Sequence, residues 1–596
     1  MTYRSPVSDV IFSLTHVAGF NEAIDEGIFG EFDAQTAASV IEEAGRFATD
    51  VIAPLNRVGD LRGARYENGH VATPPGFRDA YRAWAAGGWA GVTGSPQYGG
   101  MGLPHTVNAA CAELWNGASM GFALCPLLSE GAIGAIGAYA NDELRSVYLG
   151  KLIAGEWTGT MNLTEPQAGS DLNAVKTRAE RRPDGTYRIF GQKIFITYGD
   201  HDMADNIVHL VLARLADAPP GTRGLSLFLV PKFLVGADGS LGARNDVRCA
   251  GIEHKLGIHA SPTCVMIYGD GDGASGWLVG EENRGLAAMF VMMNSARLAV
   301  GMQGVGVADR ALQQALSYAR DRRQGRGPKG GSQMSAIIEH ADVQRMLLTM
   351  KALIHAARGI CHVTAVAIDR SHYARSDAER RQAGERAALL TPIAKAFSSD
   401  VGDEVASLGV QVHGGMGYIE ETGAAQHMRD ARIAAIYEGA NGVQAIDLVH
   451  RKLPLSDGQA VAREIAGMRA VAAEVAATGG AGFGATARRL AEAVDALERA
   501  TKFIGHALGA DAQDALAGAT PYLRLFALAL GGGCLAKAGL AAQSLARQGD
   551  SSQLGRVVLA RFFAERIATG AAGLDSAIRS GAGALEHFEA ALAEGT

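Results

Sequence analysis

The chain has 596 residues, of which 48% are hydrophobic and 20% charged, a composition that is ordinary for a soluble globular protein. Single hydrophobic cores stop growing at about 250–300 residues, so this length predicts roughly three to four domains. The formal net charge of -7 argues against a polyanion such as nucleic acid as the main partner.

The spacing of the cysteines argues against disulfide bonds and against a structural metal site. The chain contains no Cys-x-x-Cys pair and no matching histidine spacing, so we expect neither a disulfide framework nor a metal site. Buried, reduced thiols are the favoured interpretation for all six: Cys111, Cys125, Cys249, Cys264, Cys361 and Cys534. No basic segment followed by an apolar core opens the chain, so we expect no secretory signal and a cytoplasmic location.

Residues 1–155 are predicted to form an N-terminal helical domain. Four apolar residues recur at the spacing of one helical stripe, and a proline then ends the pattern: Val40, Ala44, Phe47 and Val51, followed by Pro54.

Residues 156–280 change to the pattern of a compact middle β domain. A hairpin signal at Asp184-Gly185 precedes a predicted strand at 187–197. Further apolar runs of strand length cover 225–230 and 263–268.

Helices return in residues 281–455, which we expect to form a C-terminal four-helix bundle. Three long apolar-rich segments predict helices at 289–319, 341–368 and 387–410. A glycine-rich insert at 325–331 is predicted to be a surface loop.

The last segment, residues 456–596, is an alanine-rich helical extension. One apolar stripe is formed by Leu490, Val494, Leu497 and Ile504. The segment contains 13 Lys+Arg and 14 Asp+Glu, which is close to neutral. The apolar run from Leu525 to Ala536 is too short for a membrane span, which needs ~20 residues. It predicts a buried core helix with close neighbours, because it contains three consecutive glycines.

The runs from Met161 to Asp171 and from Gly191 to Gly199 are candidate binding elements. In the first, proline and glycine shape a loop whose backbone can approach a planar ligand, and Thr164 and Ser170 supply hydroxyl groups. Taken alone, the run is equally compatible with a capped turn. In the second, Phe195 offers an aromatic face, although a strand-core aromatic is the alternative interpretation.

Two further runs are candidates for binding a phosphate and for supplying a catalytic carboxylate. Small residues in the run from Gln411 to Tyr418 allow backbone N–H groups to approach a phosphate. About 20 residues later, Glu438 directly precedes Gly439 at a predicted helix-to-helix junction. A carboxylate in a dry pocket becomes a stronger base, so Glu438 is the candidate catalytic base.

These segments, in this order, resemble the acyl-CoA dehydrogenase family over most of residues 30–455. The length and the extension resemble a long bacterial subgroup that includes 3-methylmercaptopropionyl-CoA dehydrogenase. The resemblance implies a mostly α fold with a central β domain, namely an N-terminal helical domain, a middle β domain and a C-terminal helical bundle, plus the extra helical domain. It also implies FAD-dependent oxidation of an acyl-CoA thioester to the trans-2-enoyl-CoA, with electrons passed to an electron-transfer flavoprotein.

The resemblance also assigns cofactor-binding residues. The flavin ring and its neighbourhood are expected to contact Met161, Leu163, Thr164, Gly169, Ser170, Phe195, Ile196 and Thr197. The FAD phosphates are expected to contact Arg322, Gln324, Gln411, Val412, His413, Gly414 and Gly415. Residues 411–415 are expected to serve the neighbouring subunit, which implies a homodimer. Ala440 replaces a threonine that often contacts the flavin in the family, so Asn441 is the expected polar contact there.

Glu438 is the implied base that takes the α-proton while hydride leaves the β-carbon for flavin N5. The implied substrate-binding residues are Ser170, Asn294, Arg297 and Gly439. A plain structural ion pair is the alternative role for Arg297, since a buried arginine is costly unless paired. The substrate is left open between 3-methylmercaptopropionyl-CoA and a fatty acyl-CoA.

Three other functions stay open. An acyl-CoA oxidase would share the first half-reaction and use O2. A DNA-associated protein of the same fold would need a basic face, which the near-neutral extension disfavours. The third alternative is a flavin-fold protein whose extension only mediates assembly. We expect the extension to stabilise a dimer.

Overall fold

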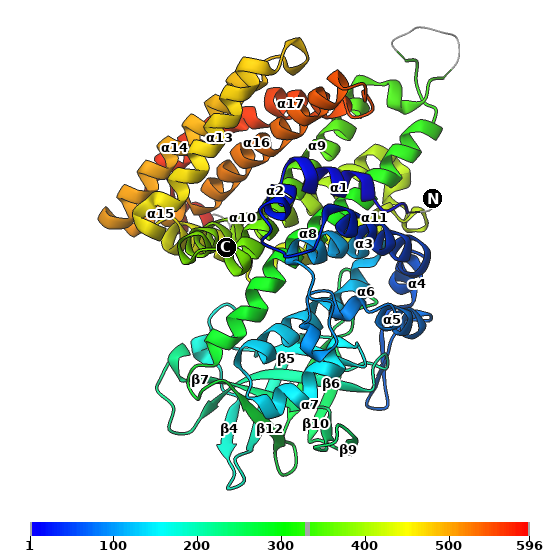
Figure 1. The fold of residues 1–596 in the computed structure, drawn as a ribbon, viewed down its shortest axis with the longest axis vertical. Coiled ribbons are helices and arrows are strands. Elements are labelled where there is room, and N and C mark those ends of the chain that lie inside the picture. Colours follow the sequence, from blue (N-terminus) through cyan, green and yellow to red (C-terminus); the bar gives the residue numbers. More distant parts are fainter. Residues whose placement is uncertain (1–2, 328–333, 594–596) are drawn as a thin grey trace. The chain divides into compact units, whose positions relative to one another are not determined.

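The computed structural model describes residues 3–327 and 334–593 and divides into two compact units (Figure 1). The first, here called the β-containing unit, is built mainly from residues 43–299. The second, the helical unit, is built from residues 6–42 and 300–596. Residues 328–331 of the predicted surface loop lie outside the described residues.

The β-containing unit begins with helices. They are α4 (Leu55–Arg62), α5 (Phe77–Ala86), α6 (His105–Tyr139) and α7 (Asp142–Ile153), and α3 (Ala34–Phe47) spans the division between the units. Helix α6 is interrupted at Ser119, whose φ of -161° and ψ of 104° are not helical. Pro126 also lies inside this helix and has no backbone N–H to donate.

The main sheet has the strand order β10-β11-β5-β12-β7-β6-β3, and β4 pairs with both β5 and β6. The strands are β3 (Trp157–Asn162), β4 (Arg178–Arg181), β5 (Tyr187–Thr197), β6 (Asn206–Leu215), β7 (Leu225–Pro231), β10 (Val247–Ile252), β11 (Thr263–Tyr268) and β12 (Ala274–Val279). Two hairpins pair β1 (Arg65–Glu67) with β2 (His70–Ala72) and β8 (Phe233–Val235) with β9 (Leu241–Arg244). Strand β6 is parallel to β3 and β4, whereas β6 and β7 are antiparallel.

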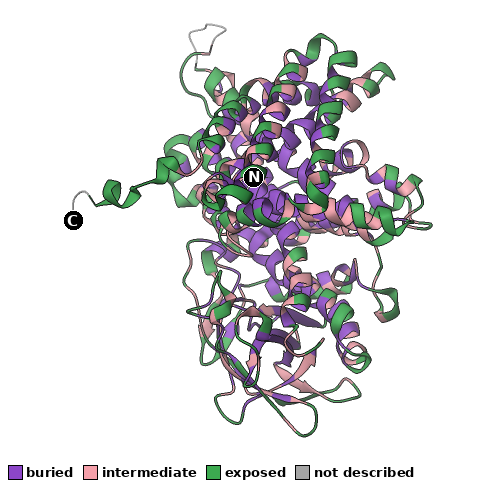
Figure 2. Ribbon diagram, turned by 90° about the vertical axis from the view of Figure 1, so that its left-hand side faces the viewer, coloured by how far each residue is buried: buried purple, intermediate pink, exposed green. Residues whose placement is uncertain are grey.

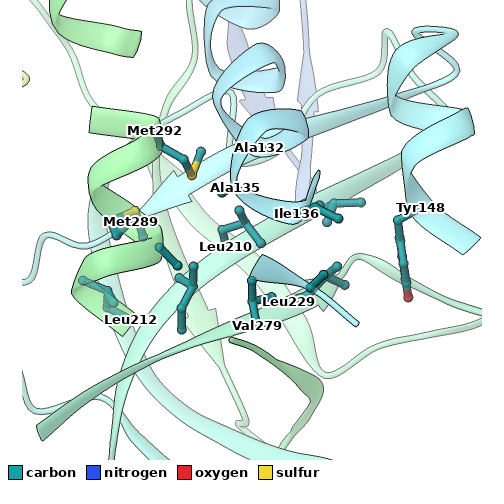
Figure 3. Close-up of a cluster of buried hydrophobic side chains, with 14 of the residues drawn as sticks. Ala132, Ala135, Ile136, Tyr148, Leu210, Leu212, Leu229, Val279, Met289 and Met292 are labelled. Carbon is teal, nitrogen blue, oxygen red and sulfur yellow. The ribbon is translucent and has the colours of Figure 1, made fainter. Parts of the chain in front are cut away.

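A core of buried side chains joins the sheet to the helices of this unit (Figure 3). Ile136 of α6 and Tyr148 of α7 lie in it together with strand residues. Met289 and Met292, from the first turns of α8 (Gly285–Asp321), complete it. Because β3 is held by this packing, the position of the loop after it is fixed as well.

The helical unit contains only helices and their connections among its described residues. Its first part comprises α1 (Val7–His16), α2 (Phe20–Asp25), the second half of α8, α9 (Ala341–Tyr373), α10 (Asp377–His413), α11 (Ala424–Ala431) and α12 (Asn441–Asp447). The extension comprises α13 (Gln459–Thr478), α14 (Thr486–Ala510), α15 (Ala512–Ala517), α16 (Ala519–Arg547), α17 (Gly555–Arg566), α18 (Ala571–Arg579) and α19 (Phe588–Leu592).

The extension contacts the rest of this unit through several helices: α16 packs against α9, α10 and α12, α17 packs against α9, and α13 packs against α10. A Cβ atom added to Gly531 would lie 2.8 Å from the Cβ of Ala356 on α9. One added to Gly359 of α9 would lie 2.7 Å from the Cβ of Cys534. The two helices therefore approach too closely for larger side chains at these points, and the predicted buried helix with close neighbours is confirmed.

Four of the described helices, α6, α8, α9 and α16, are long and apolar enough to cross a membrane by length and composition. In each, between 56% and 89% of the apolar window is buried inside the protein. Packing against other elements of the chain thus accounts for much of their apolar surface.

Several local predictions are confirmed. Strands β5 and β11 have the predicted limits, the extension's stripe from Leu490 to Ile504 is buried, and all six cysteines are buried free thiols. The buried face of α3 is turned by one position from the predicted stripe and shares only Ala44 with it. Its buried face runs through Ala37, Ile41 and Ala44, whereas Val40 and Phe47 are only half-buried.

The last described residues are exposed along their length, as Figure 2 shows near the C-terminus. They include three large apolar side chains, Leu585, Phe588 and Leu592.

Candidate active site

The loop after β3 carries the first group of predicted cofactor contacts. Leu163 is buried and Met161 and Thr164 are half-buried, whereas Gly169 and Ser170 are exposed. The hydroxyl of Ser170 and the backbone at Gly169 are therefore accessible for a ligand.

A buried ion pair fixes the start of this loop, and sequence reasoning missed it. Lys193 of β5 is fully buried, and its Nζ donates to the carbonyl oxygen of Leu163 at 2.9 Å and to Oε1 of Glu165 at 2.8 Å. Glu165 also accepts hydrogen bonds from the Thr177 hydroxyl and from the backbone N–H groups of Lys176 and Thr177. The carbonyl beside Thr164 is thus held in place.

Both partners have shifted pKa values. Burial opposes ionisation of Glu165, but the charge and hydrogen bond of Lys193, with the other donors, outweigh it and lower the pKa to about 2. Burial lowers the pKa of Lys193 to about 8, and the charge of Glu165 partly offsets this. At neutral pH the site therefore contains a charged pair.

Phe195 lies at a bulge in β5. The pairing with β11 shifts between Cys264 and Met266, and Phe195 adopts a φ of +60°, which is uncommon for a residue with a side chain. Its ring is 58% exposed, which rules out the strand-core alternative. Such bulges re-aim side chains and are frequent beside active sites, so the ring is available to stack on a planar ligand.

The next two residues, Ile196 and Thr197, are less exposed than Phe195. The side chain of Ile196 is buried in the second core of this unit, with Cys264 and Met266, so the expected cofactor contact by Ile196 stays a prediction. Thr197 is half-buried at the end of β5.

The predicted substrate contacts on α8 lie next to each other. Arg297 is buried and its Nη1 donates to Oδ1 of Asn294 at 3.4 Å, while Asn294 itself is exposed. The amide of Asn294 therefore connects the guanidinium to the surface of the helix.

In the helical unit, Arg322 and His413 line one cleft of about 500 Å³. The rings of His413 and Tyr318 stack at 4.5 Å between centroids, and Nδ1 of His413 bonds to the carbonyl oxygen of Gly409 at 2.7 Å. Burial lowers the pKa of His413, partly offset by this hydrogen bond, so the imidazole is neutral at neutral pH. The cleft thus presents a guanidinium and a fixed aromatic floor.

The remaining predicted phosphate contacts lie close in sequence to Arg322 and His413, which line this cleft. Gln324 is exposed and its carbonyl oxygen bonds to Nε2 of His340 at 2.7 Å. Gln411 is exposed and Val412 buried. Gly414, with a φ of +59°, and Gly415 are exposed, and an added Cβ would meet nothing within 4 Å at either position. Their backbone is open to a ligand.

Glu438 lies in the predicted junction, directly before α12. It is half-buried and has a φ of +55°, and Gly439 follows with a φ of +85°. Lys395 of α10, which is fully buried, donates from Nζ to the carbonyl oxygen of Gly439 at 2.9 Å. Nε2 of Gln444 donates to the carbonyl oxygens of Gly439 and Glu438 at 3.2 and 3.4 Å. Left-handed backbone is held here by two side chains that the sequence did not single out.

Asn441 faces α10. Its Oδ1 accepts hydrogen bonds from Nζ of Lys395 at 2.9 Å and from the hydroxyl of Ser399 at 3.2 Å. Its Nδ2 donates to Oδ1 of Asp400 at 2.7 Å. The amide is thus occupied in fixing the loop to α10, and the expected flavin contact by Asn441 stays a prediction.

Family models match four consecutive parts of the chain. They describe the acyl-CoA dehydrogenase N-terminal domain at residues 34–156, the middle domain at 160–270 and the C-terminal domain at 283–453. A fourth, acetyl-CoA dehydrogenase C-terminal like, matches residues 464–589 of the extension.

Known proteins resemble the chain over its length. It is 48% identical to 3-methylmercaptopropionyl-CoA dehydrogenase of Ruegeria pomeroyi, covering 95% of this chain and 96% of that protein. It is 34% identical to a broad-specificity linear acyl-CoA dehydrogenase of Mycobacterium tuberculosis, over 77% of each.

Among solved structures, butyryl-CoA dehydrogenase of Megasphaera elsdenii matches with a TM-score of 0.57 and 26% identity, over 69% of this chain and 96% of that one. ACDH-11 of Caenorhabditis elegans in complex with C11-CoA matches with a TM-score of 0.77 and 20% identity, over 95% of this chain and 92% of that one, which shows that the fold includes the extension. The chain therefore belongs to the acyl-CoA dehydrogenase family and is an FAD-dependent oxidoreductase.

Proposed function

We propose that Glu438 is the base with which this acyl-CoA dehydrogenase removes the α-proton of an acyl-CoA thioester, giving the trans-2-enoyl-CoA. The observation that carries the proposal is the anchored loop. Glu438 is a half-buried carboxylate on left-handed backbone, and Lys395 and Gln444 hold the peptide groups beside it. A base in fixed position avoids much of the entropic cost of aligning it with a weakly acidic proton.

The neighbour of Glu438 is suited to a supporting role. Tyr437 donates its hydroxyl hydrogen bond to Oε1 of Gln303 on α8. Burial, and next the negative charge of Glu438, raise the pKa of Tyr437 far above its ordinary value. Tyr437 therefore stays neutral and does not compete with Glu438 as the base.

The residues present fit FAD. Phe195 offers an exposed ring, Thr164 and Thr197 offer hydroxyl groups, and Arg322 offers a guanidinium in a cleft large enough for a phosphate-bearing ligand. When bound, FAD supplies the acceptor for the hydride that leaves the β-carbon.

For the substrate end, we assign Ser170, Asn294, Arg297 and Gly439 to binding the thioester part of the acyl-CoA. Negative charge develops on the thioester oxygen as the α-proton leaves, and fixed donors stabilise it. The preferred acyl group is proposed to be 3-methylmercaptopropionyl, because the relative of that name is 48% identical over 95% of the chain. Linear fatty acyl groups are the second candidate.

The proposal also covers the electron acceptor, the oligomeric state and the subcellular location. Electrons are passed to an electron-transfer flavoprotein, the chain forms a homodimer in which residues 411–415 serve the neighbouring subunit's FAD, and the protein is cytoplasmic. The homodimer receives support from the exposure of Gln411, Gly414 and Gly415 on the described surface.

The test is anaerobic titration of the holoenzyme with a panel of acyl-CoAs, read as bleaching of the flavin absorbance. Bleaching with 3-methylmercaptopropionyl-CoA and release of the 2-enoyl product are expected. Admission of air afterwards separates dehydrogenase from oxidase, because an oxidase releases one hydrogen peroxide per turnover without another acceptor. Absence of bleaching with every acyl-CoA would overturn the proposal.

A further inference from the structure

We propose that Arg524, in the C-terminal extension, is a positioning residue for the loop that carries Glu438. The inference rests on the proposed role of Glu438 as the base. It gives the extension a part in the reaction, through the charge of Arg524 on one face of α10 and a series of hydrogen bonds from Asp400 on that face to the loop.

The first step of the path joins α16 to one face of α10. Nη2 of Arg524 donates to Oε2 of Glu404 at 3.0 Å, and its guanidinium carbon lies 5.1 Å from the centre of the Phe397 ring. Phe397, Asp400 and Glu404 follow one another at spacings of three and four residues, so they share a face of the helix. The guanidinium therefore lies along the face that has Asp400 at its centre.

The second step joins Asp400 to the loop. Its Oδ1 accepts a hydrogen bond from Nδ2 of Asn441 at 2.7 Å. Oδ1 of Asn441 accepts one from Nζ of Lys395 at 2.9 Å, and the same Nζ donates to the carbonyl oxygen of Gly439 at 2.9 Å. Three consecutive hydrogen bonds thus lead from Asp400 to the carbonyl group of Gly439, the residue directly after Glu438.

The charges along this path explain why Arg524 matters. Asp400 is half-buried, and burial raises its pKa, whereas Asn441, Arg524 and Lys395 lower it and Asp403 raises it. Asp403 is itself 3.6 Å from the guanidinium of Arg432. Without the positive charge of Arg524, the ionised form of Asp400 is less favoured, and an ionised carboxylate is the stronger acceptor for Asn441. The amide of Asn441, which accepts from Lys395, then loses its charged acceptor and keeps only the neutral partners Ser399 and the carbonyl oxygen of Ala396.

The matched experiment compares two arginines of the same helix in the holoenzyme. Arg524→Ala is expected to lower kcat on the order of tenfold, while FAD content and KM for acyl-CoA change less than about twofold, because the base is displaced and the binding surfaces are not. Arg524→Lys keeps the charge and should restore most of kcat. Arg547→Ala is the control, since Arg547 bonds only within the extension among the contacts of the described residues, to Gln543 and to the Thr478 carbonyl.

A double-mutant cycle tests the path itself. If Arg524 acts through Asn441, then Arg524→Ala lowers kcat no further once Asn441→Ala is present. Additive losses, or wild-type kcat in Arg524→Ala, would overturn the inference. Should the alanine variant fail to fold, Arg524→Gln, which keeps the length without the charge, takes its place with the same expected loss. Absence of acyl-CoA oxidation in the wild type would instead overturn the proposed function itself.

Discussion

The ammonium group of Lys395 lies 2.9 Å from the carbonyl oxygen of Gly439, the residue that follows Glu438. Lys395 comes from the middle of α10 and has no exposed surface. Burying a lysine is costly unless its ammonium group is well hydrogen-bonded, and here it donates to both the carbonyl oxygen of Gly439 and Oδ1 of Asn441. These hydrogen bonds hold the peptide group beside Glu438.

Replacing Lys395 by methionine keeps the volume and removes the donor. The carbonyl of Gly439 and the amide of Asn441 then each lose a hydrogen bond, so we expect kcat to fall on the order of a hundredfold while FAD stays bound. Steady-state kinetics and the flavin absorbance measure the two effects. Lys351→Met, at an exposed position on α9, is the control and should behave as the wild type. Unchanged kcat in Lys395→Met would remove the anchoring role.

Glu438→Gln should abolish nearly all dehydrogenation, because the amide is not a base. A general base contributes typically about 10²–10⁴-fold, and we expect a loss at the upper end of that range. The isosteric change should leave bound FAD and acyl-CoA affinity intact, as followed by absorbance and by equilibrium titration. Glu421→Gln, at an exposed position, is the control. Substantial remaining activity would place the base elsewhere.

The pair Glu165–Lys193 predicts an acid-dependent loss of stability. The pKa of Glu165 is about 2 in the folded protein against an ordinary 4.5, so the folded state binds fewer protons between these values. This contribution is fully present above pH 4.5 and is lost as the pH falls through 2. As the pH falls from 5 to 2, the free energy of unfolding of the wild type should therefore decrease by roughly 3 kcal/mol more than that of Glu165→Gln.

Urea unfolding at a series of pH values, followed by intrinsic fluorescence, measures this difference. Equal pH dependence in the two proteins would contradict it. At pH 7, Glu165→Gln should itself be destabilised by about 3–5 kcal/mol, because Lys193 then loses its buried partner.

Phe195 should be important for FAD binding and unimportant for folding. Its ring is 58% exposed, so truncation to alanine should change the free energy of unfolding of the apoprotein by less than about 1 kcal/mol. Loss of a stacking partner should weaken FAD binding about tenfold, whereas Phe195→Trp should retain it. Fluorescence titration of apoprotein with FAD distinguishes the variants. Equal affinity in all three proteins would show that the ring does not face the flavin.

Two neighbouring glycines of α16 should respond in opposite directions. A Cβ at Gly531 would lie 2.8 Å from the Cβ of Ala356, so Gly531→Ala should destabilise the packing of α16 on α9 by about 1–3 kcal/mol. At Gly533 the nearest atom would be 3.8 Å away, on Met468, so Gly533→Ala should stabilise by up to about 1 kcal/mol through helix propensity. Thermal unfolding measures both. A stabilising Gly531→Ala would mean that the two helices are not so close.

The elements and the candidate base could be predicted from the sequence because their signals are local. The limits of β5 follow from alternation and a hairpin turn within a dozen residues. The run around Glu438, together with the motifs before it, pointed to this carboxylate through its resemblance to the family. The left-handed backbone at Gly439, with a φ of +85°, is seen only in the structure. The order of the motifs was enough to indicate the family.

The supporting residues could not be predicted, because nothing local marks them. Lys193 and Lys395 look like ordinary lysines until the fold buries them and brings Leu163 and Gly439 to their ammonium groups. The buried face of α3 lies one position from the predicted one, since its neighbours decide which side is covered. The order of the motifs in the sequence indicated which chemistry to expect, while the position of Glu438 and the contact of Arg524 with α10 were decided only by long-range packing. Hydrogen bonds between residues far apart in sequence form only when the tertiary structure brings both partners together, and they are stronger where water is excluded.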